Sequence, residues 1–136
     1  MPKSTLYAYA QGSDLDAVVE LLEARCDALV AERKWVLGDV WVVNQREPAA
    51  DGKGGTAYWD VGLNLTLPAG KARPEGWVDD LVAIATLFGK LYGETKRTFV
   101  LGVADAKTGA TKDVFFVDSA TPDLAKLRSA FEGAVS

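Results

Sequence analysis

The stretch from Thr56 to Leu67 restricts the fold of this chain more than any other part of the sequence. Apolar side chains occupy its odd positions, and polar, small or amphipathic side chains occupy its even positions. The odd set is Ala57, Trp59, Val61, Leu63, Leu65 and Leu67, and the even set is Tyr58, Asp60, Gly62, Asn64 and Thr66. This period of two is the pattern of a β-strand that buries one face. A register shift of one residue would expose the whole apolar set, so we expect a central strand with helices packed on its odd side.

The composition excludes several kinds of chemistry. The chain has 136 residues, one cysteine and no histidine. An intramolecular disulfide, a multi-cysteine zinc site and a Ser-His or Cys-His nucleophilic system are therefore ruled out. The commonest general base and metal ligand is also missing. No catalytic motif stands out, so we predict a non-enzymatic protein with no catalytic residues, no cofactor and no metal site.

Charge and hydropathy indicate a soluble protein that does not bind nucleic acid. The net charge is −4 and the isoelectric point is near 4.8, whereas nucleic-acid-binding proteins carry basic patches. No apolar run reaches the roughly 18 residues of a membrane span, and the first residues lack the apolar core of a signal peptide. We expect a cytoplasmic protein whose mild acidity favours a basic partner.

The order of the expected elements predicts the fold class. Strands are expected near residues 6–10, 40–43, 56–67, 97–105 and 112–118, and helices near residues 14–34, from 74 to a C-terminal Gly93, and after 121. The order β-α-β-β-α-β-β-α begins with a ferredoxin-like split βαβ arrangement. We therefore predict a single α+β domain over residues 1–136. It is a two-layer sandwich in which an antiparallel sheet of about five strands, in the order 5-4-1-3-2, carries its helices on one face.

The first expected helix carries two stripes of side chains. Its apolar stripe contains Cys26, which we interpret as core packing. The second stripe consists of Asp16, Glu20, Glu23 and Asp27, whose spacings of 4, 3 and 4 put them on one exposed edge of the helix. Either this acidic edge is simply a solvated face, or it docks a basic partner. The sequence leaves both interpretations open.

The sheet face opposite the helices is the main candidate for function. It would carry Tyr58, Asp60 and Asn64 from the expected central strand, Tyr7 and Tyr9 from the first strand, and apolar residues from the outer strands. Polar side chains surrounded by aromatic and aliphatic ones are typical of a recognition surface. We predict that this face binds a partner. The alternative is that the last helix or a second copy of the chain covers it.

Three short patterns have simpler explanations than catalysis or phosphate binding. The glycine-rich segment 51–55 lacks the GxxxxGK[ST] motif and no helix follows it, which favours a hairpin tip. Asp79 and Asp80 point about 100° apart on a helix and suit the helix dipole as first-turn charges. Asp60 and Asn64 lie about 13 Å apart along a strand, too far to act on one atom.

Part of the C-terminal half resembles a known group of proteins. The segments are Trp77-Val-Asp-Asp-Leu, Phe99-Val-Leu-Gly-Val, Lys107-Thr-Gly and Asp113-Val-Phe-Phe-Val-Asp. Together they resemble small immunity proteins of bacterial secreted-toxin systems, of the type VI secretion or polymorphic toxin kind. The resemblance covers residues 75–130 and implies a cytoplasmic protein that binds and neutralises a cognate toxin. The alternative function is a structural or scaffold subunit that forms a homodimer through the open sheet face.

Overall fold

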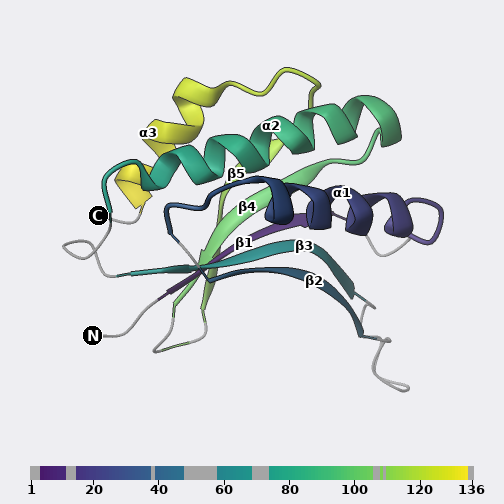
Figure 1. The fold of residues 1–136 in the computed structure, drawn as a ribbon, viewed down its shortest axis with the longest axis horizontal. Coiled ribbons are helices and arrows are strands. Elements are labelled where there is room, and N and C mark those ends of the chain that lie inside the picture. The colour runs from purple at the N-terminus through teal and green to yellow at the C-terminus, as the bar shows by residue number, and fades with distance from the viewer. Residues whose placement is uncertain are drawn as a thin grey trace.

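The computed structural model describes residues 4–11, 15–37, 39–47, 58–68, 74–105, 108 and 110–134. Within these ranges the strands and helices follow one another in the predicted order (Figure 1). The elements are β1 (Ser4–Ala10), α1 (Val19–Glu32), β2 (Val40–Glu47), β3 (Tyr58–Leu67), α2 (Trp77–Thr95), β4 (Phe99–Ala104), β5 (Thr111–Val117) and α3 (Leu124–Ala134). The predicted α+β class is confirmed.

The described strands form one antiparallel sheet in the order β2-β3-β1-β4-β5. This is the predicted order read from the other edge. One detail of the prediction is wrong, because the middle strand is β1 and not β3, whose residues Tyr58–Leu67 lie in the stretch predicted as the central strand. β3 is nevertheless paired on both sides, with β1 and β2. Its strict alternation therefore reports an interior strand rather than the exact centre of the sheet.

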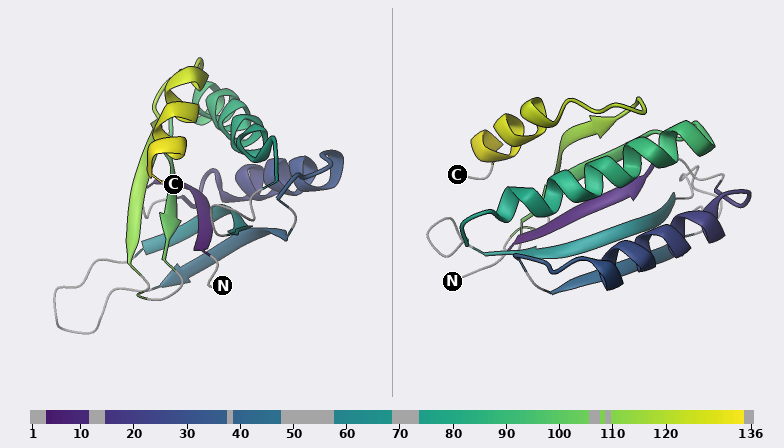
Figure 2. Two further views of the ribbon diagram at one scale, coloured as in Figure 1. Left: turned by 90° about the vertical axis from the view of Figure 1, so that its left-hand side faces the viewer. Right: turned by 45° about the horizontal axis from the view of Figure 1, so that its top comes forward.

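The helices of the described ranges all lie on one face of this sheet (Figure 2). Leu6, Ala8 and Ala10 of β1 and the odd positions of β3 from Val61 to Leu67 are buried beneath them. Phe88 of α2 stacks on Phe99 of β4 with ring centroids 4.3 Å apart. Leu127 and Phe131 of α3 belong to the same buried cluster. The last helix therefore packs on the helical side and leaves the opposite face, which we call the open face, without a described helix over it.

Cys26 lies in this core, as the apolar stripe of α1 predicts. Its side chain is 1% exposed and its thiol is free. Burial, together with the charges of Asp27 and Glu23, raises the pKa of the thiol to about 12. The neutral thiol packs as a small apolar group and is a poor nucleophile.

Two predicted helix ends are wrong. The first helix begins at Val19 rather than near residue 14, and no side chain caps it. Leu15 is instead buried, and its carbonyl accepts the amides of Val18 and Val19 in a turn that precedes the helix. The second helix continues past Gly93 and ends where Lys96 adopts a left-handed conformation, with its amide bonded to the Tyr92 carbonyl. A non-glycine residue supplies the left-handed position there, and so the glycine did not mark the end.

The two adjacent aspartates at the start of α2 tie it to different neighbours. Asp80 is 0% exposed and accepts from the Arg33 guanidinium at 2.9 and 3.2 Å. It also accepts the backbone amides of Val36 at 3.1 Å and Leu37 at 2.7 Å, which fixes the connection between α1 and β2. Asp79 is exposed and pairs with Arg128 of α3 at 2.6 Å. Both carboxylates therefore hold the helical layer together.

These two aspartates should differ sharply in their effect on stability. Asp80→Ala should lower the free energy of unfolding by about 3–5 kcal/mol, because it leaves a partly buried guanidinium and two amides without their acceptor. Asp79→Ala is the matched control, and it should cost less than about 1 kcal/mol because its ion pair is exposed. Denaturant unfolding followed by circular dichroism measures both values. Equal losses in the two variants would contradict this account of Asp80.

Candidate functional site

The open face presents two rows of side chains that cross the sheet. Strand pairing defines both rows, since directly opposed residues in antiparallel strands share a face. The first row is Trp41, Asn64, Tyr7, Gly102 and Asp113, and the second is Val43, Gly62, Tyr9, Val100 and Phe116. Each row contains one tyrosine from β1 and one glycine from a neighbouring strand. The two tyrosines thus form the middle of the open face.

The Tyr7 ring lies over Gly102. A Cβ atom at Gly102 would fall 2.2 Å from the Tyr7 hydroxyl oxygen and 2.3 Å from the adjoining ring carbon, so only glycine fits beneath the ring. The Tyr7 side chain is 8% exposed. Its hydroxyl donates to Oδ1 of Asp113 at 2.5 Å. Tyr7 therefore reaches across β4 and bonds a carboxylate on β5.

Tyr9 extends this arrangement toward β3. Its ring stacks on Tyr7 with centroids 5.4 Å apart and an interplanar angle of 26°. Its hydroxyl donates to Oδ1 of Asn64 at 2.5 Å. The predicted group Tyr7, Tyr9 and Asn64 is therefore brought together. Its hydroxyls bond within the chain and give the open face a fixed polar centre.

Trp41 and Phe116 flank this centre as exposed aromatic side chains. Trp41 on β2 is 44% exposed and Phe116 on β5 is 46% exposed. Sequence reasoning placed apolar residues from the outer strands on this face but did not single out these two. For Phe116 the reason is a bulge opposite Leu101 and Gly102, which shifts the register of β5. The alternation of side chains along the strand could not by itself show whether Phe115 or Phe116 points outward.

The four residues of the predicted acidic edge do not form one continuous stripe on α1. Asp16 lies in the turn before α1, whereas Glu20 and Asp27 are exposed on the helix itself. Glu23 accepts a hydrogen bond from the Asn44 side chain of β2 at 3.1 Å. That bond places the acidic edge along β2, the edge strand that also carries Trp41.

Two predicted residues and one segment are described less fully. Tyr58 and Asp60 lie in β3, where their backbones pair with Glu47 and Gln45. Their side chains lie outside the described part of the structure, as does the whole glycine-rich segment 51–55.

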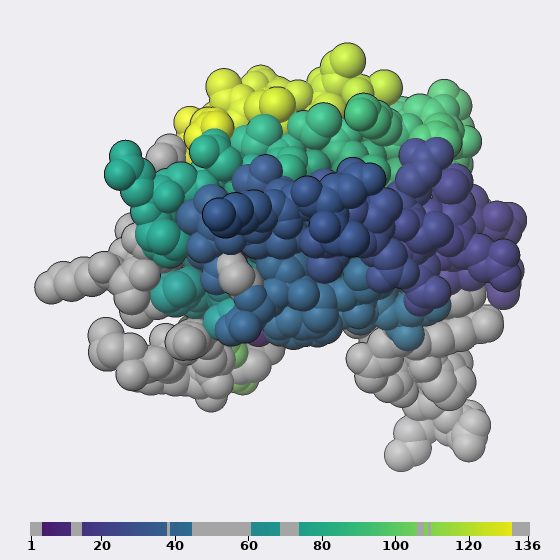
Figure 3. Space-filling view, viewed as in Figure 1, coloured from purple at the N-terminus to yellow at the C-terminus, as the bar shows by residue number. Residues whose placement is uncertain are grey.

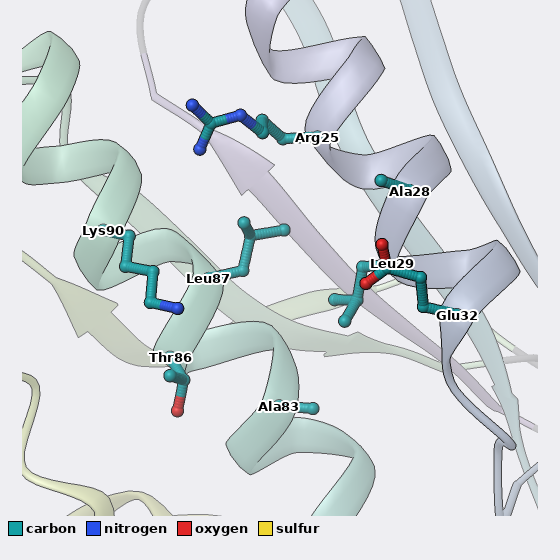
Figure 4. A pocket seen from close by; sticks show the side chains of 8 residues that line it. All are labelled: Arg25, Ala28, Leu29, Glu32, Ala83, Thr86, Leu87 and Lys90. Carbon is teal, nitrogen blue, oxygen red and sulfur yellow. The ribbon is translucent and has the colours of Figure 1, made fainter.

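The helices α1 and α2 lie next to each other on the helical side of the molecule (Figure 3). A groove between them is lined by residues of both helices. Its volume is about 420 Å³. Leu29 of α1 and Leu87 of α2 point toward each other across it, with Lys90 and Glu32 beside them (Figure 4). Arg25, on the α1 side of the groove, donates two hydrogen bonds of 2.8 Å to the carboxylate of Glu94. The groove therefore combines a narrow apolar floor with charges of both signs and offers no convergent set of polar groups.

The described residues contain no group of three or more histidine, cysteine, aspartate or glutamate side chains placed to hold a metal ion. Among the helices described, none has the length and apolar character needed to cross a lipid bilayer.

Comparison with known proteins gives no family assignment. No protein-family model matches the chain, and neither the curated protein sequences nor the solved structures contain a match. Functional inference therefore rests on the geometry of the open face.

The hydroxyl of Tyr7 should ionise at a higher pH than that of an ordinary tyrosine. Burial, followed by the hydrogen bond and the negative charge of Asp113, raises the pKa of its hydroxyl above the usual 10.0. The unfolded chain then loses this proton more readily than the folded chain. The stabilising contribution of neutral Tyr7 is complete below about pH 10 and is lost as the pH rises through the folded-state pKa.

Ultraviolet titration of the folded chain should therefore show a late tyrosine ionisation, at unusually high pH, which Tyr7→Phe removes. The same variant should also make the free energy of unfolding fall less steeply above about pH 10. Tyr92→Phe, which removes a phenol from α2 instead, should retain the late step. A late ionisation that persists in Tyr7→Phe would contradict the assignment.

Proposed function

We propose that this protein is a non-enzymatic binding protein that takes a protein partner on its open face. The observation that carries the proposal is the pair of exposed aromatic side chains, Trp41 and Phe116, on either side of the fixed tyrosine centre. Large aromatic side chains dominate the energy of protein interfaces when a partner buries them. A sheet surface of this kind suits the broad contact of a protein partner.

The rigidity of the surface supports the proposal. Trp41 and Phe116 stand on strands that are paired within the sheet, and hydrogen bonds fix the hydroxyls of Tyr7 and Tyr9 between them. A surface that is ordered before binding loses little conformational entropy when the partner arrives. Glycines beneath and beside the tyrosines, at Gly102 and Gly62, allow the strands and rings to pack closely.

Charge supports a basic partner. The chain carries a net charge of −4, and Glu20 and Asp27 are exposed along the β2 side of α1. Because Trp41 stands on β2, the acidic edge borders the same side of the open face. Charges at the rim of an interface mainly accelerate association, whereas buried aromatic anchors mainly slow dissociation.

The resemblance to immunity proteins gives the proposal its specific form. On this basis the partner is a basic secreted toxin encoded beside this chain, and the protein neutralises it by occupying its surface in the cytoplasm. The alternative, a scaffold subunit, would bury the same aromatic pair in a symmetric homodimer. Light scattering of the isolated chain separates the two, because the proposal expects a monomer.

Binding to the product of the adjacent reading frame should depend on the aromatic pair. Trp41→Ala and Phe116→Ala should each raise the dissociation constant at least about tenfold, mainly through faster dissociation. Lys90→Ala, an exposed truncation on the helical side, should leave the dissociation constant unchanged. Surface plasmon resonance measures both rates. Unaltered binding in both aromatic variants, or an isolated chain that is a stable dimer, would contradict the proposal.

The association rate from the same measurement tests whether the acidic edge attracts the partner. Glu20→Lys combined with Asp27→Lys should slow association about tenfold at low ionic strength and reduce its dependence on salt. Glu23 stays unchanged in this variant because it holds Asn44. An association rate that does not change would assign the acidic edge to solvation alone.

A further inference from the structure

Asp113 is an exposed carboxylate whose described partner carries no charge. The ion pairs among the described residues involve Glu94, Asp80 and Asp79. Asp113 has no cation within ion-pair distance in the same part of the chain, and it accepts instead from the neutral Tyr7 hydroxyl. Charged side chains on a protein surface usually stay mobile. The carboxylate of Asp113 differs because a buried phenol holds it by a hydrogen bond.

Tyr7 fixes the position of this carboxylate. The tyrosine ring is itself held over Gly102 and against Tyr9, and only 8% of its side chain is exposed. A hydrogen bond from a fixed phenol to a carboxylate is charge-assisted and short. Oδ1 is thereby occupied, while Oδ2 keeps its acceptor positions for a group that arrives from solution.

An exposed aromatic ring stands beside the carboxylate. Asp113 is opposite Gly102 and Phe116 is opposite Val100, so the two side chains share the open face two residues of β4 apart. That separation is about 7 Å along the strand. A carboxylate and an exposed aromatic side chain on strand positions this close can both contact one guanidinium group, which donates hydrogen bonds in its plane and packs its flat surface on aromatic rings.

We propose that Asp113 and Phe116, with Tyr7 as a positioning residue, form a subsite for an arginine side chain of the partner. The inference rests on the proposed function and adds the chemistry of one contact. The guanidinium donates to Oδ2 of Asp113 and lies against the Phe116 ring. Asp118, which follows β5 and is also exposed, serves as the internal comparison because no described side chain bonds to it.

N-acetyl-arginine amide tests the subsite without the partner. Titration of the isotope-labelled chain, followed by two-dimensional NMR at constant ionic strength, should give saturable shifts centred on the amides of residues 113–116 and 7. N-acetyl-citrulline amide, which is neutral and of the same shape, should give none. Asp113→Asn should weaken the arginine response roughly threefold or more, and Asp118→Asn should not change it.

The Tyr7→Phe variant tests whether Tyr7 positions the carboxylate of Asp113. It keeps the ring over Gly102 and the charge of Asp113, so the spectrum elsewhere should be preserved while the arginine response weakens. An equal response to citrulline, or an arginine response that survives Asp113→Asn, would overturn the subsite. Failure of the subsite is distinguishable from failure of the proposed function. A chain that responds to arginine but binds no adjacent gene product contradicts only the latter, and the reverse result contradicts only the subsite.

Discussion

The alternation of side chains in β1 and β3 gives the sheet two different faces. One is buried under the helices, and the other is available to bind a partner. Ala8 and Leu6 of β1 lie opposite Leu63 and Leu65 of β3, and all four are buried beneath the helices. Phe88 of α2 belongs to the same buried cluster, and its ring stacks on Phe99 of β4. Because successive strand residues point to opposite faces, this packing also commits Tyr7 and Tyr9 to the open face. The positions of Tyr7, Tyr9 and Asn64 on the open face follow from that constraint.

Both sides of the sheet are fixed, but by different interactions. On the helical side, the buried carboxylate of Asp80 and the ion pairs of Arg25 and Arg128 connect the helices to one another and to the chain between them. On the open face, two tyrosine hydroxyls bond to a carboxylate and an amide on neighbouring strands. The polar groups in the middle of the open face are thus already partnered within the chain. The proposed binding energy therefore comes from the flanking aromatic side chains and one outward carboxylate.

Much of the fold could be predicted because hydrophobic periodicity reports burial directly. The strand order follows from the element order and from the rule that split βαβ units place the third strand between the first two. Features that depend on tertiary contacts could not be predicted. The burial of Asp80 depends on Arg33, which is 47 residues away in sequence, and the start of α1 depends on Leu15 entering the core. The outward position of Phe116 depends on a bulge that has no sequence signature.

We expect the open face, rather than the helical side, to contact the partner. Hydroxyl-radical footprinting of the chain with and without the adjacent gene product tests it at individual side chains. Oxidation of Trp41 and Phe116 should slow in the complex, while Tyr92 on α2 should be oxidised at the same rate in both states. Protection of Tyr92, with Trp41 and Phe116 unchanged, would place the partner on the helices and rule out binding through the open face.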